Sequence, residues 1–120
     1  MRPSALAAGL GAGRALFGVA LLAMPARFTR VWVGADDAPT TVLMRCVAGR
    51  DIALGLGQAV AAVRGNDTAR WVAAGILADA TDAAVTVAAG DRIPRNGRLA
   101  TAAIGGGAVF FGVCLVRKLD

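Results

Sequence analysis

Hydrophobic residues fall into four long stretches along the chain, and short polar connectors that contain Gly or Pro separate them. The stretches cover residues 4–24, 40–63, 71–89 and 99–116. A helix needs roughly 17–25 apolar residues to cross the hydrocarbon core of a bilayer. The pattern therefore predicts an all-α fold: an integral membrane, antiparallel four-helix bundle that forms a single domain over residues 1–120.

A soluble four-helix bundle is the main alternative, and it requires an apolar stripe along one side of each helix. The first and fourth stretches are apolar on all sides instead. A cleaved signal peptide is disfavoured for the first stretch, because Arg14 interrupts it and Pro25 stands at its end. Hydrophobic residues make up 57% of the chain and charged residues 18%, a balance that is typical of a membrane protein.

Basic residues lie singly beside the stretches rather than in runs. The 13 Lys and Arg outnumber the eight acidic residues, but their scatter disfavours nucleic acid as a partner and favours the lipid bilayer. Arg27, Arg30 and Trp32 suit a headgroup layer. Four spans place both termini on one side, and five Lys or Arg lie near each side, so the charge count does not predict the orientation.

Charged residues also occur inside the stretches, where they are costly. At about 1.5 Å per residue, five of them lie near the bilayer midplane: Arg14, Arg50, Asp51, Asp79 and Asp82. An unpaired charge at this depth costs about 2.5–3.5 kcal/mol, so we expect an intramembrane polar network with a net charge of −1. Arg45 lies nearer one surface and either joins this network or reaches the headgroups.

Small residues recur at four-residue spacing, as in Gly9 and Gly13 of the first stretch. This spacing is typical of close contacts between membrane helices. We therefore expect Gly9 and Gly13 to face a neighbouring helix.

Missing residue types limit the chemistry of the chain. It contains no His, Glu or Tyr, and its two Cys are too few for a tetrahedral zinc site. The four spans leave only about 40 residues for connectors and tails, too few for a catalytic domain outside the membrane. We expect no enzymatic activity, no cofactor and no metal.

The motifs with the most distinctive spacing lie in the first three stretches. They are Arg14-x3-Gly18, the string Gly49-Arg50-Asp51-Ile-Ala-Leu-Gly55-Leu, and Asp79-x2-Asp82. Together they resemble small four-span actinobacterial membrane proteins of unassigned function, which are loosely similar to DoxX-like membrane proteins. The resemblance implies the fold and an Arg/Asp core. It implies no oxidoreductase activity, because the paired cysteines of the thiol-handling relatives are missing.

These observations favour a multi-pass protein of the cell membrane that serves as a non-catalytic accessory or scaffolding subunit. Its partner is then a larger envelope complex, and the charged network holds the helices in register. The alternative is a small proton-linked transporter or a ligand-binding membrane protein that uses the midplane Arg/Asp cluster, with Asp79 and Asp82 sharing a proton. A membrane enzyme ranks third.

Overall fold

The computed structural model describes residues 1–119, which are helical over most of their length. The helices are α1 (Pro3–Ala23), α2 (Pro25–Trp32), α3 (Ala38–Arg64), α4 (Thr68–Ala89) and α5 (Arg95–Leu119), and a 3-10 turn (Gly90–Arg92) follows α4. Within residues 1–119 there is no strand, and four helices (α1, α3, α4 and α5) are long and apolar enough to cross a membrane. The predicted all-α, antiparallel four-helix membrane bundle is confirmed.

The local sequence sets the helix ends. The carboxylate of Asp37 caps α3 by accepting hydrogen bonds from the backbone N–H and the hydroxyl of Thr40, at 2.9 and 2.8 Å. Gly65 ends α3 in the left-handed conformation (φ 72°), which glycine adopts at little cost. Pro25 cannot continue the hydrogen-bond ladder of α1, and the backbone turns at Met24 (φ −131°, ψ 54°).

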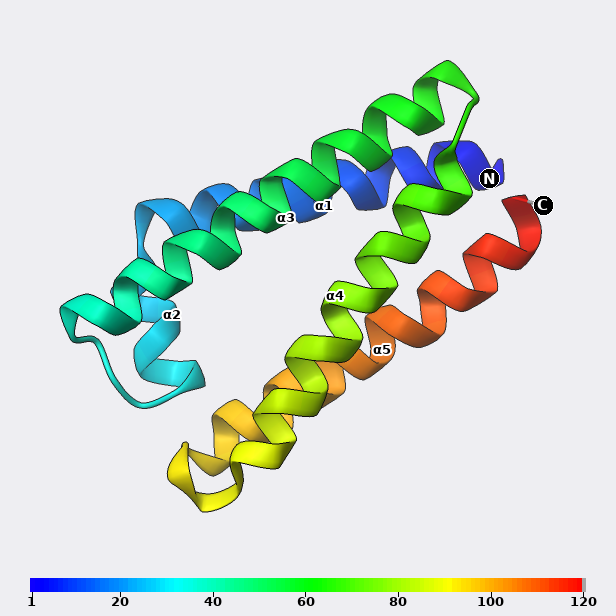
Figure 1. The fold of residues 1–120 in the computed structure, drawn as a ribbon. Coiled ribbons are helices and arrows are strands. Elements are labelled where there is room, and N and C mark those ends of the chain that lie inside the picture. The colour runs from blue at the N-terminus through cyan, green and yellow to red at the C-terminus, as the bar shows by residue number, and fades with distance from the viewer. Residues whose placement is uncertain (120) are drawn as a thin grey trace.

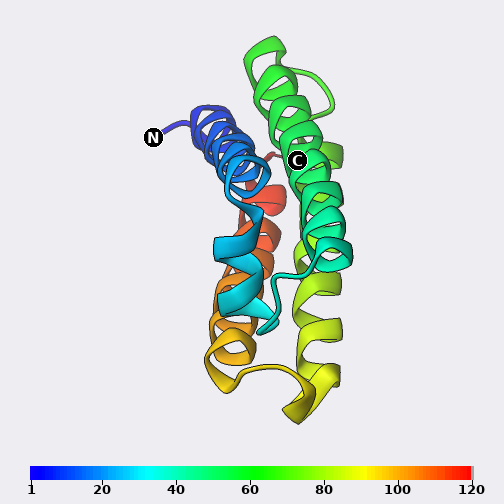
Figure 2. The same cartoon turned by 90° about the vertical axis from the view of Figure 1, so that its left-hand side faces the viewer.

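Helix α2 occupies a segment that the hydrophobic pattern assigns to a connector. It turns away from the axis of α1 and runs toward the start of α5 (Figure 2). A Cβ on Gly97 of α5 would collide with the carbonyl oxygen of Trp32. The indole Nε1 of Trp32 donates a hydrogen bond to Oγ1 of Thr86 in α4 at 3.0 Å. Helix α2 therefore closes one end of the bundle, and Trp32 bonds to a neighbouring helix rather than only facing headgroups.

The spanning helices form two antiparallel pairs, because α1 packs along α3 and α4 packs along α5 (Figure 1). An added Cβ on Gly11 or on Gly55 would lie 2.7 or 2.5 Å from backbone atoms of the other helix, so these glycines permit the close α1–α3 contact. Among the described residues, nothing lies within 4 Å of an added Cβ on Gly9 or Gly13. The expectation that Gly9 and Gly13 face a neighbouring helix is wrong, since the contact face of α1 is the one with Gly11 and Gly18.

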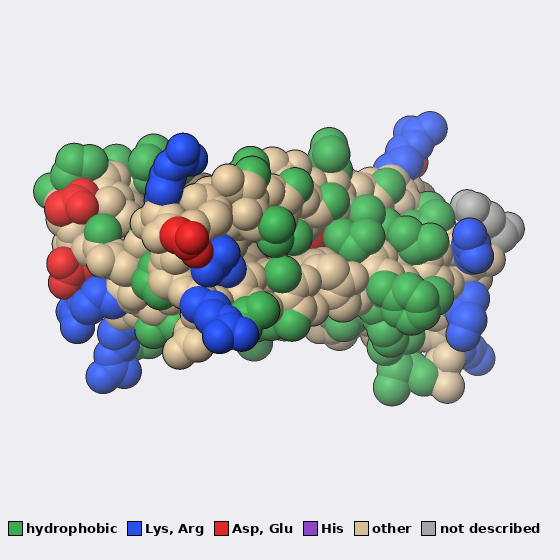
Figure 3. Space-filling model, turned by 90° about the horizontal axis from the view of Figure 1, so that it is seen from below, with side chains coloured by type: hydrophobic (Ala, Val, Ile, Leu, Met, Phe, Trp, Pro, Cys, Tyr) green, Lys and Arg blue, Asp and Glu red, His purple; other side chains and the backbone are tan. Residues whose placement is uncertain are grey.

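The surface has the distribution of side chains that a bilayer requires. The start of α1, the end of α5 and the α3–α4 turn lie at one end of the molecule (Figure 1). Figure 3 shows Lys and Arg near both ends of one face, with a band between them that is free of basic side chains. Leu16, Leu77 and Phe110 point outward with 70–72% of their surface exposed, so in a membrane these helices contact lipid chains.

Candidate functional site

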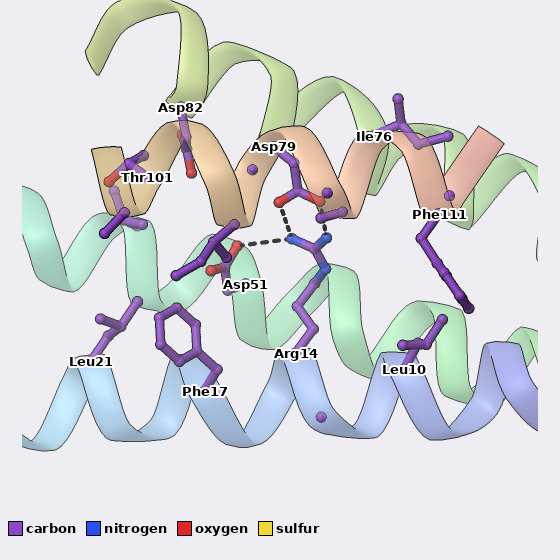
Figure 4. Close-up of a pocket in the computed structure, with 18 of the residues that line it drawn as sticks. Leu10, Arg14, Phe17, Leu21, Asp51, Ile76, Asp79, Asp82, Thr101 and Phe111 are labelled. Carbon is purple, nitrogen blue, oxygen red and sulfur yellow. Dashed lines mark hydrogen bonds and ion pairs between the residues drawn. The ribbon is translucent and has the colours of Figure 1, made fainter. Parts of the chain in front are cut away.

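The five side chains predicted at the midplane meet in one network of ion pairs. Figure 4 shows Arg14, Asp51, Asp79 and Asp82 of this network. Arg14 of α1 binds Asp79 of α4 through both guanidinium ends: Nη1 donates to Oδ1 at 2.9 Å, and Nη2 donates to Oδ2. Arg50 of α3 binds Asp82 of α4 in the same bidentate way, at 2.8 and 2.7 Å. Asp51 lies between the arginines, 3.1 Å from Nη2 of Arg50 and 3.5 Å from Nη1 of Arg14.

The connections within this network are unequal. Each arginine contacts two carboxylates, whereas Asp79 and Asp82 each contact one arginine in the described part of the chain. Bidentate pairs between guanidinium and carboxylate are strong ion pairs with a defined geometry. Because Arg14 and Arg50 belong to one helix pair and both bind α4 of the other, the network fixes the position of one pair relative to the other.

The spacing of residues along α4 explains this geometry. Asp79 and Asp82 are three residues apart and share one face of the helix. Gly75 lies one turn earlier on that face and leaves room for Arg14, because a Cβ added to Gly75 would lie 3.3 Å from Nη2 of Arg14. Thr86, one turn after Asp82, continues the same face toward α2.

The network is one positive charge short of neutral. Arg45 is exposed and forms no ion pair within residues 1–119. The cluster therefore contains two guanidinium groups and three carboxylates. Arg45 does not join it, so it does not supply the positive charge that would make the cluster neutral. In the low dielectric of a bilayer, such an excess charge is costly unless a counter-charge or a proton accompanies it.

A cavity of about 700 Å³ lies beside the network, between the two helix pairs (Figure 4). Most of its wall is apolar, and the charged members of the wall are Arg14, Asp51, Asp79 and Asp82. Its volume falls within the roughly 300–1,000 Å³ that is usual for ligand pockets.

Packed side chains lie at both ends of the cavity. At the end with the chain termini, a buried cluster joins α1, α3, α4 and α5 through Ala7, Ala62, Val72 and Leu115. At the other end lies α2, whose Trp32 reaches both α4 and α5. Contacts therefore join the two helix pairs at both ends of the cavity.

The side of the cavity between α1 and α5 is open. Five large hydrophobic residues line the cavity and yet are 42–73% exposed: Leu10 and Phe17 of α1, Val31 of α2, and Ile104 and Phe111 of α5. This opening faces the direction in which a bilayer surrounds the protein, so lipid-soluble molecules have direct access to the cavity.

Glycines without close neighbours lie along both edges of the opening. Gly9 and Gly13 of α1 and Gly107 of α5 line the cavity, and an added Cβ on any of them meets nothing within 4 Å among the described residues. A glycine inside a helix costs about 0.5–1 kcal/mol relative to alanine. These positions widen the cavity and expose bare backbone to whatever occupies it.

Gln58 is a buried polar residue of the cavity wall that the charge pattern does not reveal. Its Nε2 donates a hydrogen bond to the carbonyl oxygen of Ala7 at 2.8 Å and so joins α3 to α1. The signal for its position is its spacing of seven residues from Asp51, which places both on one face of α3.

Within residues 1–119, no group of three or more candidate ligand side chains could hold a metal ion. Comparisons of the chain with protein-family models, with curated proteins and with solved structures found no match.

Proposed function

We propose that this protein is a ligand-binding membrane protein that takes a lipid-soluble molecule from the bilayer into the cavity between its helix pairs. The observation that carries the proposal is the lateral opening between α1 and α5. Gly9, Gly13 and Gly107 lie along its edges. A Cβ added to any of them would have no described residue within 4 Å.

Packing density supports this function. Protein interiors are normally packed like organic crystals, with few voids larger than a water molecule. An apolar space of about 700 Å³ that opens toward lipid is therefore filled when the protein is in a membrane. The exposed residues of its lining include large apolar side chains, which favour an occupant that arrives from the lipid phase rather than from water.

The ion-pair network supports a binding role for the cavity rather than proton-linked transport. Asp79 and Asp82 bind different arginines, which is not the arrangement of two carboxylates that share a proton. The bidentate pairs instead hold the two helix pairs at a fixed separation, so that the cavity exists before the ligand enters.

The other expectations from the sequence stay proposals. A non-catalytic accessory role in a larger envelope complex is compatible with ligand binding, because such a subunit can present a lipid-soluble molecule to its partner. The resemblance to small four-span membrane proteins supports the cell membrane as the location.

Native mass spectrometry of the protein released from mild detergent tests the proposal. The wild type should retain a bound small molecule. Gly13→Phe or Gly107→Phe should remove most of it, because each side chain fills part of the cavity. Gly106→Phe is the matched control, since an added Cβ there also meets nothing within 4 Å of the described residues but Gly106 does not line the cavity. The proposal fails if the wild type retains nothing or if all three variants retain it equally.

A further inference from the structure

We propose that the cavity binds a lipid-soluble monocation, an ammonium- or phosphonium-type molecule whose positive centre lies beside the carboxylates of the network. This inference rests on the proposed ligand-binding function and adds the charge of the ligand.

The charge of the cavity wall carries the inference. Asp51, Asp79 and Asp82 all line the cavity, but of the two arginines only Arg14 does so among the described residues. Arg50 binds Asp82 and Asp51 and lies outside the lining. A molecule inside the cavity therefore faces three carboxylates and one guanidinium, and the whole network contains one more carboxylate than guanidinium groups. A monocation supplies the missing charge.

The carboxylates are accessible to such a molecule without loss of any ion pair. The side chains of Asp82 and Asp79 are 21% and 14% exposed, compared with 6% for Asp51. Figure 4 shows Asp82 near Thr101 and Asp79 above Arg14, both directed into the space between the helices. A carboxylate has about four lone-pair sites, so each can bind its arginine and still attract a cation.

The rest of the wall suits the apolar part of a lipid-soluble cation. Phe17 and Phe111 line the open side, and aromatic faces attract organic cations such as quaternary ammonium groups. A phosphate or carboxylate headgroup is disfavoured beside the network, because the excess negative charge repels it. A neutral hydrocarbon chain leaves that excess uncompensated.

Tetraphenylphosphonium and tetraphenylborate provide the test, because they have nearly the same size and shape and opposite charge. Binding is measured by equilibrium dialysis with the full chain in nanodiscs of zwitterionic lipid, and uptake by protein-free discs is subtracted. The wild type should bind the phosphonium at least about tenfold more tightly than the borate. Gly107→Phe should abolish the binding and Gly106→Phe should preserve it.

Asp51→Asn tests the role of the excess charge. The variant neutralises the network, yet Arg14 and Arg50 each keep a bidentate carboxylate, so the fold is retained, which circular dichroism checks. The affinity for the phosphonium should fall by about tenfold. Asp37→Asn makes the same change of charge at an exposed cap outside the cavity and should leave the affinity unchanged.

The outcomes separate the two proposals. Equal binding of both ions that Gly107→Phe abolishes would overturn the cation inference and leave ligand binding in place. Unchanged affinity in Asp51→Asn, or binding of neither ion, would also overturn the inference. Ligand binding itself is tested separately, by whether native mass spectrometry detects a retained molecule. The comparison of the two ions on the wild type decides the question even if a variant fails to fold.

Discussion

Loss of an arginine from the network should destabilise the protein more than loss of an aspartate. Arg50 donates to Asp82 at 2.8 and 2.7 Å and to Asp51 at 3.3 and 3.1 Å. In Arg50→Ala, Asp82 loses its arginine partner, while Asp51 keeps Arg14 at 3.5 Å. In Asp82→Asn, Arg50 keeps Asp51, and the amide oxygen still accepts a hydrogen bond.

The connections set the size of each effect. Removal of one partner from a buried ion pair costs about 3–5 kcal/mol, and an unpaired aspartate at the centre of a membrane helix costs about 2.5–3.5 kcal/mol. The Arg50 side chain is 30% exposed, which favours the lower end, so Arg50→Ala should cost about 3 kcal/mol. Asp82→Asn should cost about 1 kcal/mol. The double variant should be more stable than the sum predicts, with a coupling energy of roughly 2 kcal/mol.

Reversible unfolding in mixed micelles measures these free energies. The mole fraction of sodium dodecyl sulfate is raised, and helix content is followed by far-ultraviolet circular dichroism for the wild type, both single variants and the double variant. The reasoning is refuted if the two effects add within about 0.5 kcal/mol, or if Asp82→Asn is the more destabilising of the two single substitutions.

Three further predictions concern packing, capping and topology. Gly55→Ala should cost about 1–3 kcal/mol in the same unfolding assay, because its Cβ would lie 2.5 Å from backbone atoms of α1. Gly49→Ala, with nothing within 4 Å among the described residues, should instead stabilise the protein by about 0.5–1 kcal/mol, and equal losses in the two variants would contradict this. A backbone hydrogen bond at the start of α3 lowers the pKa of Asp37, so its contribution to stability is complete above the ordinary aspartate pKa and is lost as pH falls through the lowered value. Asp37→Ala should therefore have a lower melting temperature than the wild type at neutral pH and a smaller deficit in acid; a deficit that does not change with pH would count against the cap. Reporter fusions at Arg64 and Asp91 should give opposite locations, and equal locations would contradict the four-span topology.

The spans and the members of the network follow from energetics that the sequence displays directly. Apolar runs of this length have few alternatives to membrane helices, and charges at the midplane must find partners, so Arg14 and Arg50 of two helices pair with the aspartates of a third. The partner that each arginine takes depends on how the helices rotate and pack. That information arises only in the assembled bundle.

The cavity depends on which face of α1 packs against α3, and the sequence is ambiguous there. Gly9 and Gly13 have the spacing of a contact motif, but Gly11 and Gly18 form the contact, and the two sets lie on different sides of the helix because successive residues are about 100° apart. Helix α2 is equally hard to predict. It has only eight residues, too few to show the repeating hydrophobic pattern from which a helix is recognised in a sequence.

The order of the charges along the chain has a consequence for biogenesis. Helices α1 and α3 bring two central arginines and one aspartate, and the remaining two aspartates belong to α4. While the ribosome is still synthesising the second half, the first helix pair therefore holds an uncompensated positive charge inside the bilayer, and α4 enters with the opposite charge. We therefore predict that the first helix pair captures α4 electrostatically during insertion, and that two fragments divided at the Gly65 turn reassemble when they are co-expressed.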